Sequence, residues 1–136
     1  HELVHVAQAY RARRDDDWIV EGLAEFYTLE LMHRSGTIST ARRDRGFAQL
    51  EQWAERIKSL EGQRSTGART AKGVTVMRAL DAELRRRSQD QHSLDDVART
   101  LAEDGAPVSV ERLRRISAKL AGGPLEALSA ENLAEY

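Results

Sequence analysis

The first five residues of the chain, His1-Glu2-Leu3-Val4-His5, carry side chains suited to metal chemistry. On a helix, residues four apart lie on one face, so His1 and His5 can bind one Zn²⁺ through ring nitrogens at about 2.0–2.1 Å. Glu2 is displaced from His1 by about 100° around the helix axis, which favours contact with a metal-bound water over direct coordination. Zinc lowers the pKa of that water, and a carboxylate base takes its proton as the water attacks a peptide carbonyl. The pattern predicts a metallopeptidase centre with Glu2 as the general base.

A catalytic zinc ion needs a third protein ligand, and Glu21 is the candidate. Fifteen residues separate Glu21 from His5, and we expect it in the first turn of the next helix, so a short connection can bring it back against the first. Two histidines and one glutamate form a known ligand set of zinc peptidases, which leaves one position for water. The alternative is an exposed glutamate favoured at a helix start by the helix dipole. The spacing alone leaves both interpretations open.

The pattern of apolar residues predicts an all-α fold. Apolar residues recur at helical spacing almost throughout, and no segment shows sustained strand-like alternation. The sequence Ser93-Leu94-Asp95-Asp96 is a near-variant of the capping box and marks a helix start. The expected helices run over about 1–12, from a cap at Asp17 to just before Gly36, from Arg42 to about Leu60, from about Lys72 to Arg87, from Ser93 onward, from after Ser109 to Gly122, and in a short terminal helix opened by Pro124. Residues 61–67 are the clearest loop.

Length and composition fit one domain spanning residues 1–136, with the zinc site in 1–27 and a helical remainder in 28–136. Because the first residue is already inside the motif, we expect the chain to be part of a longer protein, whose preceding part is its partner. The 21 basic and 22 acidic residues nearly cancel, which gives no reason to expect nucleic acid or a membrane surface as a partner. Without cysteine, disulfides and thiolate chemistry are excluded, while the cellular compartment stays open.

The sequence H-E-L-V-H followed by W-I-V-E-G-L-A-E-F-Y resembles the gluzincin zinc metallopeptidases. It is most similar to the glycyl aminopeptidase family and more distantly to the aminopeptidase N family. Lys72-Gly73 before a long apolar helix extends the likeness. The resemblance implies that Glu21 is the third ligand and that the intact protein binds one Zn²⁺ per chain. It also implies aminopeptidase-type cleavage of a peptide substrate, with this chain as the C-terminal, helical part of the catalytic domain and the zinc helix first.

Three other residues bear on this assignment. Glu25 follows Glu21 by four residues on the same face, where it either accepts the free N–H of a histidine ligand or pairs with a nearby arginine. His33 is too far along its helix to share a metal with Glu21 and is expected near the helix end. His92 is expected in a loop.

The sequence departs from the family at one important position. The family has a tyrosine two residues before Lys72-Gly73, where its hydroxyl stabilises the oxyanion of the tetrahedral intermediate, and this chain has Thr70. Tyr10, Tyr27 and Arg69 are the alternative donors. The sheet-bearing subdomain that precedes the zinc motif in the family is also missing, so we expect the isolated fragment to bind zinc weakly and to be inactive.

Two rival interpretations remain beside the peptidase. One is a pseudopeptidase that binds the metal but has lost turnover with the tyrosine. The other is a helical interaction domain that uses the peptidase scaffold to bind partners.

Overall fold

The computed structural model describes residues 16–55, 67–103 and 106–134, and within these ranges it is helical, without a strand. Its elements are α2 (Asp17–Arg34), α3 (Thr40–Ala54), α4 (Gly67–Arg87), α5 (Leu94–Glu103), α6 (Val110–Ala121), the 3₁₀ helix η2 (Glu126–Leu128) and α7 (Ala130–Ala134). The predicted all-α class is confirmed for this part of the chain. The expected helix over 1–12 lies outside the described residues. None of the described helices is both long and apolar enough to cross a membrane.

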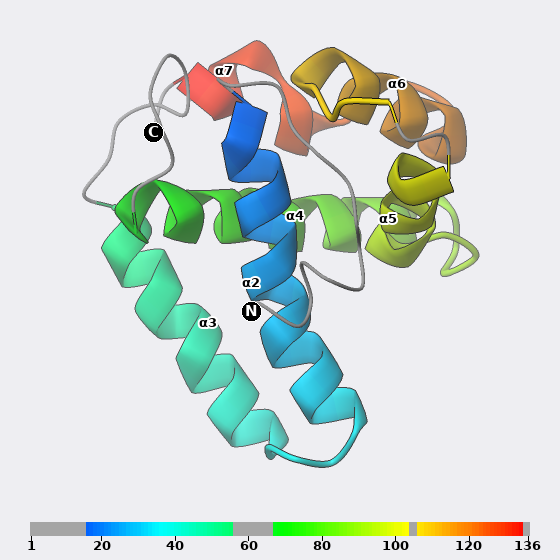
Figure 1. The fold of residues 1–136 in the computed structure, drawn as a ribbon. Coiled ribbons are helices and arrows are strands. Elements are labelled where there is room, and N and C mark those ends of the chain that lie inside the picture. The colour runs from blue at the N-terminus through cyan, green and yellow to red at the C-terminus, as the bar shows by residue number, and fades with distance from the viewer. Residues whose placement is uncertain (1–15, 56–66, 104–105, 135–136) are drawn as a thin grey trace.

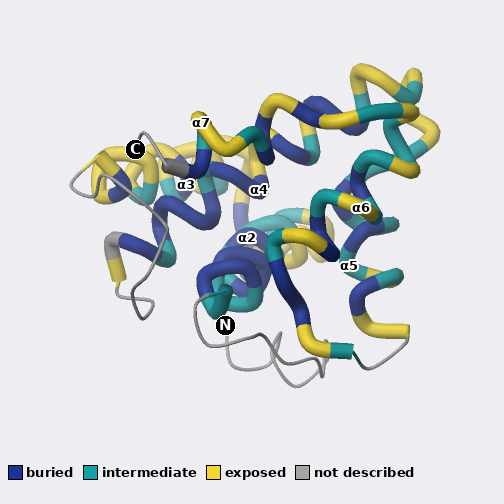
Figure 2. The backbone as a smooth tube through the Cα atoms, turned by 90° about the horizontal axis from the view of Figure 1, so that it is seen from above, coloured by how far each residue is buried: buried dark blue, intermediate teal, exposed yellow. Residues whose placement is uncertain are grey.

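Helix α4 is the centre of the fold. It packs most extensively against α2 and α3, and it also contacts α5, α6 and η2. In Figure 1, α2 crosses α4, α3 returns beside α2, and α5 and α6 lie toward the end of α4. The inner face of α4 carries Val74, Met77, Leu80 and Leu84, each at most 1% exposed and spaced three or four residues apart. Seen from above, buried residues follow the inner faces of the helices and exposed residues the outer ones (Figure 2).

The crossing of α2 and α4 depends on two glycines. A Cβ atom added to Gly22 would lie 2.9 Å from the carbonyl carbon of Gly73, and one added to Gly73 would lie 2.9 Å from the carbonyl oxygen of Trp18. If either glycine were replaced by a larger residue, the backbone of α2 or of α4 would have to move. The buried side chains of Trp18 and Ile19 pack into the core beside this contact. The first turns of α2 are therefore fixed against α4.

Several predicted helix ends are confirmed. Helix α2 ends before Gly36, whose φ of +78° is a left-handed conformation natural for glycine. At the start of α5, the Asp96 carboxylate accepts the Ser93 N–H at 3.0 Å, as the capping box requires, and the Ser93 hydroxyl accepts the Asp95 N–H at 3.2 Å. Helix α6 begins after Ser109, whose hydroxyl accepts the Arg112 N–H, and ends at Gly122.

The predicted cap of α2 was wrong by one residue. Asp16, not Asp17, occupies the cap position, and it makes no side-chain cap hydrogen bond. Its carboxylate instead accepts the backbone N–H of Val110 at 3.1 Å, at the start of α6. The acidic side chain thus joins the beginnings of two helices that are distant in sequence, a tertiary contact that local pattern does not reveal.

Further boundaries differ from the prediction, among them the end of α3, which lies at Ala54 rather than near Leu60. Helix α3 begins at Thr40 rather than Arg42, because the Ser39 hydroxyl caps it by accepting the Arg42 N–H. Helix α4 begins at Gly67, five residues before the expected start at Lys72. After Pro124 the chain forms the 3₁₀ turn η2 and then α7 instead of one helix, because the buried Glu83 carboxylate holds the N–H groups of Glu126 and Ala127, each at 2.9 Å.

Candidate metal centre

Of the four residues assigned to the zinc centre, the structure describes only Glu21. His1, Glu2 and His5 lie outside the described residues. Glu21 is the fifth residue of α2, just past the predicted first turn, and its side chain is half-buried. It stands directly before Gly22, so the close α2–α4 contact fixes its backbone. A ligand on such a rigid element is held in one position, which is what a metal site requires.

Glu21 and Glu25 share one flank of α2, and the contacts of Tyr27 show which flank this is. The Tyr27 hydroxyl binds Asp95 of α5. Glu25 is two residues before Tyr27 and therefore about 200° away around the helix, so it faces away from α5. In Figure 1 the side of α2 opposite α5 is where α4 begins. The two glutamates consequently lie on the side of α2 that faces away from α5.

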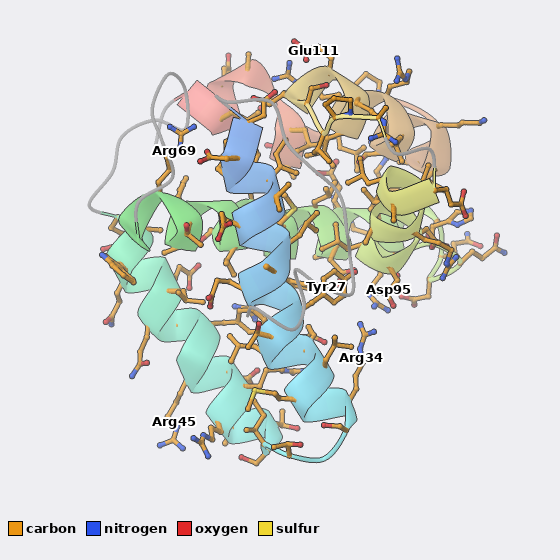
Figure 3. All side chains as sticks on the ribbon, in the orientation of Figure 1. Tyr27, Arg34, Arg45, Arg69, Asp95 and Glu111 are labelled. Atoms are coloured by element: carbon orange, nitrogen blue, oxygen red, sulfur yellow. The ribbon has the colours of Figure 1, made fainter. Side chains whose placement is uncertain are left out.

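The first turns of α4 contain two buried basic residues, Arg69 and Lys72. Arg69 precedes Gly73 by four residues and thus shares the face of α4 that meets α2. Both Arg69 and Lys72 are only 2% exposed. Figure 3 shows Arg69 rising from the start of α4. Buried charges are stable only with polar or charged partners, and Glu21, Glu25, Arg69 and Lys72 all take part in non-covalent interactions. Two buried basic residues thus lie in the first turns of α4, and each of them has a non-covalent partner.

The Tyr27 side chain is held on the α5 side of α2. Its hydroxyl donates to Asp95 Oδ1 at 2.7 Å, and the Arg34 guanidinium binds the same carboxylate at 3.1 and 3.3 Å (Figure 3). Burial and the Asp95 carboxylate raise the pKa of Tyr27 well above its usual range. The hydroxyl joins α2 to α5 on the side away from Glu25, so Tyr27 is a poor replacement for the family tyrosine. Thr70 is half-buried in α4, one residue after Arg69.

The two histidines within the described part of the chain have other partners. His33 lies in the last turn of α2, as predicted, and hydrogen-bonds Thr40 at 2.9 Å and Arg43 at 3.2 Å. His92 lies just before α5, with Nδ1 3.5 Å from Asp96. Within the described ranges no three histidine, aspartate or glutamate side chains are grouped closely enough to hold a metal ion. A three-ligand site that uses Glu21 must draw at least one further ligand from residues outside these ranges.

Sequence reasoning missed the burial of Lys72, whose only local signal is the apolar segment that follows it. Burial lowers the pKa of Lys72 to about 7, whereas an unfolded lysine has a pKa of about 10.4. Between these values the unfolded chain binds more protons than the folded one, so the stability of the fold increases as pH rises from 7 toward 10.

We therefore expect the free energy of unfolding, measured with urea, to increase between pH 7.0 and 9.5, and Lys72→Met to reduce that increase. Lys119 of α6 is exposed, and Lys119→Met is the matched control. An equal pH dependence in the wild type and in Lys72→Met would show that Lys72 stays charged in the folded protein.

Comparison of the chain with known protein families, with curated proteins and with solved structures gives no match in any of the three.

Proposed function

We propose that this chain is the zinc-binding, helical part of a gluzincin-type metallopeptidase that hydrolyses peptide bonds, with aminopeptidase-type specificity. The observation that carries the proposal is the pair of motifs in the sequence, H-E-L-V-H and, fifteen residues later, E-G-L-A-E-F-Y. The assigned ligands are His1, His5 and Glu21, and the assigned general base is Glu2. The fixed α2–α4 crossing beside Glu21 supports the proposal, because it holds a carboxylate ligand in place.

The protein's residues have separate parts in this mechanism. Zinc, when bound, supplies a water of lowered pKa. Glu2 takes a proton from that water during attack on the peptide carbonyl and returns it to the leaving amine. Glu21 contributes a negative charge that helps to keep the metal in place. Glu25 lies one helical turn further on the same flank, where it orients a histidine ligand or pairs with a nearby arginine.

Oxyanion stabilisation is the weakest part of this machinery. A threonine hydroxyl does not reach as far as a phenol from the same backbone, and loss of one oxyanion donor costs about 10²–10³ in rate. Arg69, adjacent to Thr70 and on the face of α4 toward α2, is the remaining described donor. The Thr70 substitution is also the observation that favours the second candidate, a metal-binding pseudopeptidase.

The proposal is tested by zinc content and peptide hydrolysis in the full-length protein. The wild type should hold about one zinc per chain, and His5→Ala should lose it, because two protein ligands rarely retain a catalytic zinc. His33→Ala is the control, since His33 hydrogen-bonds Thr40 and Arg43 instead.

Equal zinc content in the wild type and His5→Ala would remove the site assignment. Full zinc without hydrolysis of aminoacyl or peptide substrates would favour the pseudopeptidase. A protein that folds without zinc would favour a helical interaction domain.

A further inference from the structure

A groove of about 490 Å³ lies between α6 and the segment that forms η2 and the start of α7. Its volume is within the range of about 300–1,000 Å³ that is usual for binding pockets. The residues that line it are Arg114, Arg115, Ala118, Pro124, Leu125, Leu128, Ser129 and Ala130. They come from a part of the molecule that contains none of the residues assigned to the zinc centre.

The floor of the groove is apolar. Leu125 and Leu128 are anchored in the core, with 5% and 2% of their surface exposed, and Ala118 and Pro124 complete the apolar lining. An apolar side chain placed here would remove both its own surface and that of the floor from water, at about 25 cal/mol per Å² of apolar area. The groove can therefore hold an aliphatic or aromatic side chain.

One wall of the groove is positively charged. Arg114 and Arg115 both line it from α6. Arg114 uses Nε to donate to the carbonyl oxygen of Leu128 at 2.8 Å, which holds its side chain along the groove. In the part of the chain that the structure describes, neither guanidinium forms an ion pair with a carboxylate. Guanidinium groups bind carboxylates through parallel hydrogen bonds, so this wall is complementary to an acidic group.

We propose that this groove binds a peptide segment of a partner protein in which an acidic residue stands next to an aliphatic or aromatic one. The apolar residue occupies the floor, and the neighbouring carboxylate pairs with Arg114 and Arg115. A peptide fits better than a fatty acid, because Ser129 and two arginines among the lining residues suit the polar backbone and carboxylate of a peptide better than a continuous hydrocarbon chain. The inference is independent of the peptidase proposal.

The test uses the full chain and three fluorescein-labelled hexapeptides, Gly-Ser-Asp-Leu-Ser-Gly and its counterparts with isoleucine or phenylalanine in place of leucine. Fluorescence polarisation gives Kd, and matched peptides with asparagine in place of aspartate isolate the contribution of the carboxylate. Arg115→Glu reverses the charge at an exposed position, so the fold should be retained. Arg45→Glu is the matched control, because Arg45 is also exposed and lines a smaller groove at the far end of the α2–α3 pair (Figure 3).

We expect at least one aspartate peptide to bind and its asparagine counterpart to bind about ten-fold more weakly. Arg115→Glu should weaken binding of the aspartate peptide by about ten-fold or more, whereas Arg45→Glu should leave its Kd unchanged. Decanoate at the same concentration should not displace the peptide. Binding by none of the three peptides overturns the proposal. An equal loss in Arg115→Glu and Arg45→Glu overturns it in favour of general charge attraction, and displacement by decanoate overturns it in favour of a lipid site.

Discussion

Glu2→Gln in the full-length protein is expected to keep zinc bound and to slow peptide hydrolysis by about 10²–10⁴-fold. The amide of glutamine has nearly the shape of the carboxylate but cannot accept the proton of the attacking water. Loss of a general base removes a rate factor of that size. Zinc should stay, because Glu2 is displaced by about 100° from His1 around the predicted helix and is assigned no bond to the metal.

Zinc content and the hydrolysis rate must be measured on the same preparation of this variant. If Glu2→Gln loses zinc together with activity, Glu2 coordinates the metal, and the division of roles between Glu2 and Glu21 is wrong. If hydrolysis persists at the wild-type rate with zinc bound, another group is the base.

Glu21→Gln should weaken zinc binding much more than Glu25→Gln. A carboxylate ligand supplies negative charge and one of three protein bonds to the metal, and an amide replaces it poorly. An outer partner of a histidine ligand contributes less, and its loss weakens metal affinity by about 10–100-fold. The two residues form a matched pair, because both are half-buried on the same flank of α2 and one helical turn apart.

The measurement is competition for zinc against a chelator of known affinity, with circular dichroism to show that both variants keep their helices. If Glu25→Gln is the more damaging variant, the ligand is one turn further along α2 than assigned. Equal, small effects would mean that neither carboxylate binds the metal.

The helical class and several helix ends could be predicted because they depend on local chemistry. Ser93 and Ser109 cap their helices with their own hydroxyl groups, and Gly36 and Gly122 take left-handed conformations that few other residues adopt. Errors arose where a distant residue decides the local structure. Glu83 holds the N–H groups of η2 from 43 and 44 residues away, and no pattern near Pro124 reveals this.

The candidate site was predictable only in its residue types and spacing. The sequence identifies Glu21 and Glu25 as neighbours on one helix face, but it does not show that Gly22 meets Gly73 or that Arg69 and Lys72 are buried. The contact between Gly22 and Gly73 forms only because the two helices cross with almost no side chain between them. The structure also assigns Tyr27 to a hydrogen bond with Asp95, which sequence spacing leaves open.

X-ray absorption at the zinc edge would show whether one zinc ion is bound by His1, His5 and Glu21, as we propose. For the full-length protein we predict a four-coordinate zinc with two imidazole nitrogens at about 2.0–2.1 Å and one carboxylate oxygen at about 2.0–2.2 Å, and water at the fourth position. The carboxylate contribution should change in Glu21→Gln. A protein without bound zinc, a spectrum with fewer than two imidazoles, or a spectrum identical in the wild type and Glu21→Gln would contradict the assignment.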